Sequence, residues 1–545
     1  MKRLIQMCAA VASLCFAMPA RAQEPPIVNA PAGSVRGEAV AGTQVFRGIP
    51  FARSPVGELR WRAPLRLPRW RGVRDATQFG AACVQPPSPQ TSIYYNVPPA
   101  MSEDCLFLNI WAPENARNAP VFVWIHGGSL VSGAGSSSYY DGARLAERGI
   151  MVVSINYRLG ALGYLAHPGL SAESRRNISG NYGLMDQIEA LRWIRRNIGA
   201  FGGDANNVTI AGESAGALSV MYLMAAPDAR GLFHRAIAQS AYMITAPVLR
   251  NNPYEGAFSA EAVGVWLASQ LGATDIAGLR SMSAEAIVSR AATTGYFPFV
   301  TVDGRTVPRQ LVDVFDRGDQ ARVPILAGYN EGEIRSLRFL LPSPPTDAAA
   351  YTNEIRARYG ELADAFLGRY PADNIGESML ATTRDAMYGW TSERLTARQT
   401  AIGAPSFLYY FDHGYPAADD AGLHAFHAAE IPYVFGTIGE TPERWPAVPQ
   451  TAQEQRMSDA MLNYWASFAR DGAPRAQGEA EWRPYGTDRA YMAFADVPIM
   501  RAAPPNAYEL HETVVCRRRA QGNLAWNWNV GVISPPLPPE APACR

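Results

Sequence analysis

Residues 208–217 have the sequence VTIAGESAGA, which is the clearest indication of the fold. Its apolar and β-branched start, 208–211, is typical of a buried strand, and the residues from Ala215 onward favour a helix. Between them, residues 212–216 follow the pattern G-x-S-x-G. A serine on such a tight turn lifts its hydroxyl above the sheet, and the glycines are needed because side chains there would collide with the adjacent strand and helix. We therefore interpret Ser214 as a nucleophile. An ordinary turn serine is the alternative, which the flanking strand and helix disfavour.

The rest of the chain alternates short apolar runs with helical patterns, which is typical of an α/β protein with a mostly parallel sheet. Apolar stripes at helical spacing follow residues 184–198 and 457–468. Residues 250–295 and 341–400 are helical but less regular, so we expect helical insertions on the sheet. No linker divides residues 23–545, which predicts a single domain. The further strands, whose apolar character indicates helices on both faces, are 121–125, 151–155, 323–327 and 406–411.

A second turn of small residues follows the predicted strand 121–125. It contains His126, Gly127, Gly128 and Ser129. Consecutive small residues after a strand expose backbone N–H groups, which can hold the oxygen of a tetrahedral intermediate. We expect Gly128, Ser129 and Ala215 to form this oxyanion hole. A glycine turn without a ligand is the alternative when the turn is considered without Ser214.

The choice of a general base is narrow because the chain has only seven histidines. In enzymes with such a strand–serine–helix turn, the acid and then the base follow the nucleophile along the chain. We select His427, which follows the predicted strand 406–411, and interpret His424 as a packing or surface histidine. His424, His427 and Glu430 are spaced i, i+3, i+6 and could share a helix face. This spacing does not match the metalloprotease pattern H-E-x-x-H, so we expect no metal.

The orienting acid is expected after the predicted strand 323–327. Two glutamates compete there, Glu331 and Glu333. We favour Glu333 and keep Glu331 as the alternative.

Composition excludes several function classes. The 545 residues include 49 basic and 49 acidic side chains, so no excess of positive charge suggests nucleic acid as a partner. The single lysine is Lys2. A Schiff-base lysine, a Ser-Lys pair and a phosphate-loop lysine are therefore all excluded from the body of the protein.

The first residues predict export. Residues 1–22 combine a basic start, an apolar run and a small-x-small end, Ala20-Arg21-Ala22, which is typical of a secretory signal peptide. The apolar run is shorter than the roughly 20 residues of a membrane-spanning helix. The mature chain would be secreted or periplasmic, with no stable membrane anchor. Four cysteines then remain, and neighbours in sequence favour the disulfides Cys83–Cys105 and Cys516–Cys544, with free buried thiols as the alternative.

Taken together, these features resemble a known family, the type-B carboxylesterases of the carboxylesterase/cholinesterase group, which have the α/β-hydrolase fold. Ordered blocks spread over most of the mature chain carry the resemblance. They are FRGIPFA at 46–52, EDCLFLN at 103–109, NYRLGALG at 156–163, GNYGLMDQ at 180–187, FGGD at 201–204, the serine turn, and HAAEIPYVFG at 427–436.

The resemblance implies Ser214 as nucleophile, His427 as base and a glutamate as acid, the latter placed at Glu333 by its distance from Gly328. It also implies the Cys83–Cys105 disulfide. This sequence departs from the family at Ser129, where a third glycine is frequent, and at Ile334, where a glycine usually follows the acid. The disulfide loop 84–104 has no tryptophan of the kind on which choline esters stack, and Tyr94 and Tyr95 are its nearest substitutes. A dedicated cholinesterase is therefore disfavoured.

These observations predict a serine hydrolase that cleaves small-molecule carboxylic esters through an acyl-enzyme, without cofactor or metal. An amide, lactone or thioester hydrolase would use the same site, and a non-catalytic binding protein on this fold is the alternative from another class. We expect Phe297, Phe299 and Tyr95 to contribute to the substrate pocket; core packing would explain the two phenylalanines equally well. The sequence does not fix the oligomeric state.

Overall fold

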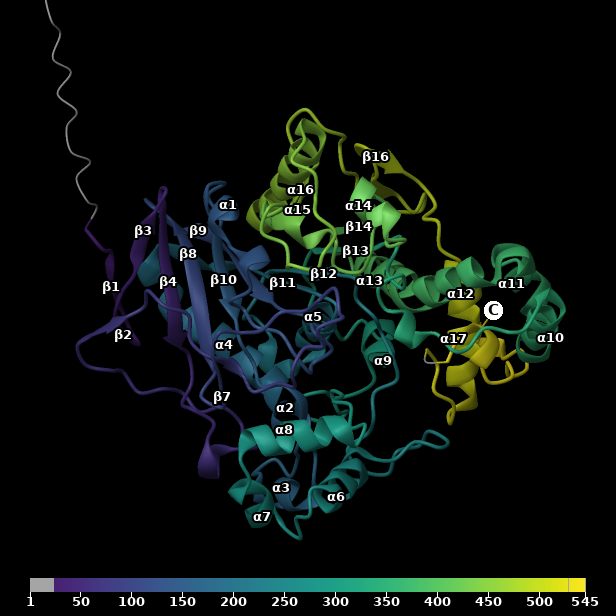
Figure 1. The fold of residues 1–545 in the computed structure, drawn as a ribbon, viewed down its shortest axis with the longest axis horizontal. Helices are drawn as coiled ribbons and strands as arrows, with labels where there is room; N and C mark the ends of the chain where they lie inside the picture. Colours follow the sequence, from purple (N-terminus) through teal and green to yellow (C-terminus); the bar gives the residue numbers. More distant parts are fainter. Residues whose placement is uncertain (1–23, 528, 545) are drawn as a thin grey trace, which may run out of the picture.

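The computed structural model describes residues 24–527 and 529–544, and the predicted signal peptide, residues 1–22, lies outside these residues. The central sheet has eleven strands (Figure 1) in the order β16-β15-β14-β13-β12-β11-β9-β10-β8-β4-β3. Neighbouring strands from β10 to β15 pair in parallel, and the pairs at both ends of the sheet are antiparallel. The predicted α/β architecture with a mostly parallel sheet is confirmed.

The strands agree with the predicted apolar runs. The five predicted strands correspond to β9, β10, β11, β13 and β14, whose bounds appear in this full set: β1 Ile27–Ala30, β2 Gly33–Arg36, β3 Glu38–Val40, β4 Thr43–Pro50, β5 Val73–Asp75, β6 Ala82–Cys83, β7 Met101–Ser102, β8 Phe107–Pro113, β9 Ala119–Ile125, β10 Met151–Ile155, β11 Gly203–Glu213, β12 Arg235–Gln239, β13 Ile325–Asn330, β14 Ser406–Phe411, β15 Tyr491–Phe494 and β16 Pro498–Arg501.

The helices include the three that the sequence predicts, now bounded as α4, α5 and α16. Their full set is α1 Ala143–Ala146, α2 Gly160–Tyr164, α3 Pro168–Glu173, α4 Tyr182–Asn197, α5 Ala215–Ala225, α6 Ala260–Gln270, α7 Ile276–Ser281, α8 Ala284–Thr293, α9 Leu311–Asp316, α10 Ala348–Tyr359, α11 Ala363–Arg369, α12 Ile375–Arg384, α13 Trp390–Ala401, α14 Pro416–Asp420, α15 Ile431–Phe435, α16 Ala452–Asp471 and α17 Tyr508–Gln521.

Strand β9 explains why the central strands are apolar throughout. Its side chains alternate between two cores: Val121, Val123 and Ile125 pack with residues of α4 and α5, whereas Phe122 and Trp124 pack with residues of α15 and α16. Because successive side chains of a strand point to opposite faces, a strand covered on both faces needs apolar residues at every position. All five side chains are fully buried.

The two segments predicted to be insertions contain most of the remaining helices. Residues 250–295 contain α6, α7 and α8, which lie together at the bottom of Figure 1. Residues 341–400 contain α10 to α13, and α10, α11 and α12 lie beside α17 at the right of the view. A π-helical turn, Asp385–Gly389, joins α12 to α13. The two segments thus lie in different parts of the molecule (Figure 1).

Both expected disulfides are present. Cys83 is bonded to Cys105 and closes the loop 84–104, and Cys516 of α17 is bonded to Cys544 near the C-terminus. Among the described residues, no helix combines the length and the apolar character that crossing a membrane requires.

Candidate active site

Ser214 occupies a strained turn between β11 and α5. Its backbone has φ 56° and ψ −122°, a conformation that residues with a side chain rarely adopt. A Cβ at Gly212 would lie 2.5 Å from the carbonyl carbon of Gly216, and a Cβ at Gly216 would lie 2.0 Å from the carbonyl oxygen of Ile125. The two glycines therefore allow β9, β11 and α5 to approach closely enough to form the turn, as the sequence predicts.

The glycine turn after β9 lies against this serine. A Cβ at Gly127 would lie 2.9 Å from the carbonyl oxygen of Glu213 and 3.2 Å from the Cβ of Ser214. The next three residues, Gly128, Ser129 and Leu130, have φ values of 101°, 57° and 61°. The backbone of this turn is thus held in the left-handed region next to Ser214. Ala215, the first residue of α5, adds an N–H that has no partner within the helix.

His427 and Glu333 are in direct contact. Nδ1 of His427 forms a short hydrogen bond with Oε2 of Glu333, and both side chains are buried. The other oxygen of Glu333 accepts the backbone N–H of Asn330 at 2.9 Å. The alternative acid, Glu331, instead contacts Arg384, with 3.1 Å between Nη1 and Oε1. Of the two glutamates, the structure brings Glu333 to the imidazole.

The second ring nitrogen faces the turn that carries Ser214. Nε2 of His427 lies 3.0 Å from Oε1 of Glu213, the residue immediately before Ser214. Among the hydrogen bonds of the described residues, none joins the Ser214 hydroxyl to this ring. Hydrogen bonds between a nucleophile and its base are often long in a site without substrate and tighten when substrate binds.

Three buried carboxylates act on this single imidazole. Glu213 and Glu333 contact its two ring nitrogens, and Glu430 adds a weaker electrostatic attraction. Burial raises the pKa of Glu213 to about 8. Burial disfavours the charged form of His427, but the carboxylates of Glu213 and Glu333 outweigh it and raise the pKa of His427 to about 9. The pKa of Glu430 is raised by burial too, and its carboxylate accepts hydrogen bonds from Gln239 at 2.9 Å and Asn330 at 2.6 Å.

Tyr94 supports the histidine from the disulfide loop. Its hydroxyl donates to the carbonyl oxygen of His427 at 2.7 Å and lies 2.8 Å from the hydroxyl of Ser336. Tyr95, the residue expected in the pocket, instead packs against Arg444. The guanidinium carbon of Arg444 lies 5.6 Å from the centre of the Tyr95 ring. Of the two tyrosines, Tyr94 is therefore the one that contacts His427.

A cavity of about 370 Å³ lies between α2, α6 and residues 244–247 and 295–301. Phe297 and Phe299 line it, and the described lining residues include neither Tyr95 nor Ser214. These lining residues carry no charged side chain. Three aromatic residues of its wall are exposed to solvent, Phe258 at 74%, Phe297 at 47% and Trp266 at 41%. The cavity is thus apolar and open to the outside through aromatic side chains.

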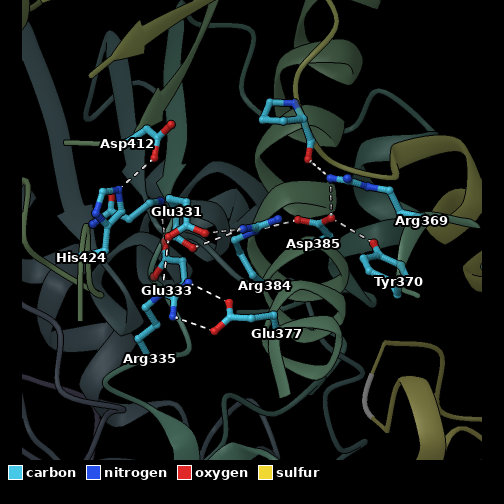
Figure 2. A network of polar contacts seen from close by, with 12 residues as sticks. Glu331, Glu333, Arg335, Arg369, Tyr370, Glu377, Arg384, Asp385, Asp412 and His424 are labelled. Carbon is cyan, nitrogen blue, oxygen red and sulfur yellow. Dashed lines mark hydrogen bonds and ion pairs between the residues drawn. The ribbon is translucent and has the colours of Figure 1, made fainter. Parts of the chain in front are cut away.

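One cluster of side chains in the described part of the chain has the spacing of metal ligands. Among the described residues, Glu331, Asp412 and His424 bring one ligand atom each within 4.8 Å of one another (Figure 2). However, both ring nitrogens of His424 already contact carboxylates, Asp412 at 3.1 Å and Asp419 at 2.7 Å. These hydrogen bonds, of which that with Asp412 is the stronger influence, outweigh burial and raise the pKa of His424 to about 9. A protonated imidazole has no lone pair for a metal, so this donor set favours a charge network.

Sequence reasoning missed Glu213, Glu430 and the role of Tyr94. Glu213 occupies a variable position of the G-x-S-x-G pattern, and the sequence suggests Glu430 only as a metal ligand. A signal is nevertheless present, because both glutamates adjoin apolar runs. An acid that such a run buries is almost always paired with another group.

Comparisons with known proteins identify the family to which the chain is similar. The model of the carboxylesterase family matches residues 24–507. The chain is 34% identical over 495 residues to a fumonisin B1 esterase from Sphingopyxis macrogoltabida, covering 88% of each chain. It is 34% identical over 488 residues to a para-nitrobenzyl esterase from Bacillus subtilis, covering 87% of this chain and 95% of the relative. A solved PNB esterase structure superposes with a TM-score of 0.77 at 32% identity, covering 88% of this chain and 97% of the other.

Proposed function

We propose that this chain, which belongs to the carboxylesterase family and is a carboxylic ester hydrolase, performs its reaction with Ser214 as nucleophile, His427 as base and Glu333 as orienting acid. The observation that carries this assignment is the position of the His427 ring. One nitrogen binds Glu333, and the other faces the residue next to Ser214. Such a ring can accept a proton on one side while the carboxylate on the other stabilises the imidazolium that results.

In the first half of the reaction, Oγ of Ser214 attacks the ester carbonyl carbon while Nε2 of His427 takes the hydroxyl proton. The carbonyl electron pair moves onto oxygen, and the N–H groups of Gly128, Ser129 and Ala215 hold this oxyanion. The intermediate then expels the alcohol, which receives the proton from His427. An acyl-enzyme on Ser214 remains.

In the second half, His427 removes a proton from water as the water oxygen attacks the acyl carbon. A second oxyanion forms in the same hole and collapses, the bond to Oγ breaks, and Ser214 recovers the proton from His427. The carboxylic acid leaves. This chemistry uses only side chains and backbone groups of the chain.

Two histidines three residues apart allow a matched test. His427→Gln and Ser214→Ala should lower kcat for p-nitrophenyl butyrate by about 10⁴-fold or more. His424→Gln is the control, because its ring contacts Asp412 and Asp419 and not the nucleophile turn. Labelling by a fluorophosphonate should disappear in the first two variants and remain in the control. Full activity in Ser214→Ala would refute the assignment.

We also propose that the apolar cavity receives the hydrocarbon part of the ester. Its volume of about 370 Å³ falls within the usual range for small-molecule sites, roughly 300–1,000 Å³. Its wall at residues 244–247 begins five residues after Gln239, whose carbonyl accepts the backbone N–H of Ser214. Since the described lining residues are uncharged, a neutral acyl or aryl group is the expected occupant.

Phe297→Ala and Phe299→Ala test the cavity. Either variant should lower kcat/KM for p-nitrophenyl decanoate about tenfold more than for the acetate, because part of the buried apolar area is lost. The control is Phe339→Ala, which removes a 79% exposed ring that does not line the cavity. Equal effects on both esters would contradict this part of the proposal.

Export of the chain is a further part of the proposal. It is supported by the signal-peptide pattern of residues 1–22 together with two disulfides, since disulfides persist in oxidising compartments. Cell fractionation should recover the protein outside the cytoplasm with Gln23 as its first residue. Recovery of a chain that still carries residues 1–22 would contradict it.

A further inference from the structure

The two glutamates that flank Gly332 point to different partners. Glu333 binds His427, whereas the carboxylate of Glu331 contacts Arg384 (Figure 2). Nη1 of Arg384 lies 3.1 Å from Oε1 of Glu331 and 3.4 Å from its carbonyl oxygen. One guanidinium thus contacts both the side chain and the backbone of the turn that carries the triad acid.

Arg384 is itself held rigidly. It is the last residue of α12, its side chain is 9% exposed, and its Nε donates to Oδ1 of Asp385 at 2.8 Å. Asp385 begins the π-helical turn and is fully buried. Its Oδ2 accepts the hydroxyl of Tyr370 at 2.9 Å, and that hydroxyl lies 2.9 Å from Nε2 of His511. The guanidinium therefore rests on a buried chain of contacts that ends on α17.

The opposite side of the turn is fixed by backbone contacts alone. The N–H of Glu331 donates to Phe411 at 2.9 Å, and the N–H of Gly332 donates to Ala425 at 2.8 Å. These bonds fix the backbone but leave the Glu331 side chain free to rotate. Three cationic groups face that carboxylate: Arg384 at 3.1 Å, Arg335 at 3.5 Å and the imidazole of His424 within 4.8 Å. Of these, Arg384 also contacts the carbonyl oxygen of Glu331.

We propose that Arg384 is a positioning residue for the reaction: by binding Glu331 and its carbonyl from the π-helical turn, it fixes the 331–333 turn so that Glu333, and not Glu331, faces His427. This inference rests on the proposed roles of Glu333 and His427. The physical reason is that Glu333 meets the imidazole N–H only while the turn that carries it keeps one conformation. An anchor at Glu331 holds that conformation before substrate binds. The π-helical turn that begins at Asp385 fits this role, because such turns occur often at functional sites.

The test compares variants in the two arginines that contact Asp385. Arg384→Met should lower kcat for p-nitrophenyl butyrate about tenfold with KM changed less than threefold, because the misplaced acid impairs the chemical step and not binding. Arg384→Lys keeps the charge and should recover part of kcat. Arg369→Met is the matched control. Arg369 also contacts Oδ2 of Asp385, at 3.4 Å, but not Glu331, so kcat should stay near the wild-type value.

A second variant covers the case in which Arg384→Met does not fold. Glu331→Gln leaves the Arg384–Asp385 pair intact and removes only the charge that the guanidinium holds. It should lower kcat severalfold with an unchanged KM and an unchanged thermal midpoint. Wild-type kcat in Glu331→Gln, or an equal loss of kcat in Arg369→Met, would overturn the inference. The proposed function fails separately, if Ser214→Ala or His427→Gln remains active.

Discussion

Glu213 is a residue of the site whose acid–base chemistry the fold alters strongly. Its carboxylate is buried and faces Nε2 of His427, the nitrogen that accepts the proton of Ser214 in the proposed mechanism. A negative charge beside an imidazole stabilises the protonated ring and so opposes its use as a base. The same charge can stabilise the imidazolium that forms in the transition state. Glu213 is therefore expected to influence both the pH dependence and the rate of the reaction.

This link gives a prediction with a definite sign. Because the Glu213 carboxylate raises the pKa of His427, Glu213→Gln should lower that pKa and move the acid limb of the kcat/KM profile to lower pH, by about one unit or more. The measurement is kcat/KM for p-nitrophenyl butyrate between pH 5 and 10. Glu443→Gln, at an exposed position, makes the same change in net charge and should leave the limb in place. A shift to higher pH would contradict the assignment.

Ser129 has an unusual backbone conformation. Its φ of 57° is left-handed, which costs a residue with a side chain about 1–2 kcal/mol. The family resemblance pointed to a frequent glycine at this position, and the backbone explains that preference. Only the N–H is needed for an oxyanion, so the side chain is replaceable.

Ser129→Gly should therefore leave kcat within about threefold and should not lower the free energy of unfolding. Urea denaturation and p-nitrophenyl butyrate turnover measure the two quantities. The control is Ser132→Gly in the same turn, where φ is not positive and glycine should destabilise by about 0.5–1 kcal/mol. A tenfold loss of kcat in Ser129→Gly would mean that the hydroxyl itself takes part.

At the scale of elements, five central strands were predictable, whereas the central strand β12 and the edge strands were not. β10 and β14 consist of buried residues throughout, and a continuous apolar run indicates a strand covered on both faces. β4 mixes polar and apolar residues, and its antiparallel pairing with β8 shifts register between Phe46 and Ile49. Such pairing depends on contacts about sixty residues apart along the chain, which local patterns do not report.

The site was predictable to a similar degree. The G-x-S-x-G turn, the glycine turn and His427 have local signatures, whereas the choice between Glu331 and Glu333 depends on which side of the turn each faces. That direction follows from Arg384, Phe411 and the segment around Ala425, which come from three other elements. The same difficulty applies to Tyr94 and Tyr95. They are neighbouring residues of the same type, so the sequence does not indicate that they have different partners.

The disulfide loop 84–104 offers a prediction based on that difference. Tyr94 donates its hydroxyl to the carbonyl of His427, and one such hydrogen bond contributes about 1 kcal/mol. Tyr94→Phe should therefore lower kcat about fivefold through looser placement of the imidazole. Tyr95→Phe, one residue away and stacked under Arg444, should have no effect. Equal kcat values for the two variants would show that the loop does not position the base.

At the scale of the whole molecule, two disulfides constrain two different regions of the chain. Cys83–Cys105 spans 22 residues and closes the loop that carries Tyr94, whereas Cys516–Cys544 spans 28 residues and ties the C-terminal segment to α17. In the chain-entropy model the two loops have similar stabilising effects, about 3–4 kcal/mol each. Their effects on activity should differ, because only the first loop contacts the site.

Replacing each pair with serine separates stability from catalysis. Both double variants should lose about 3–4 kcal/mol in the free energy of unfolding, measured by urea denaturation. Cys516→Ser/Cys544→Ser should keep kcat within about twofold under native conditions, since α17 still packs against the π-helical turn. Cys83→Ser/Cys105→Ser should lose kcat at least as strongly as Tyr94→Phe, because its loop no longer holds the tyrosine against His427. A loss of kcat confined to the C-terminal pair would reverse this assignment and would place the constraint on the triad in α17.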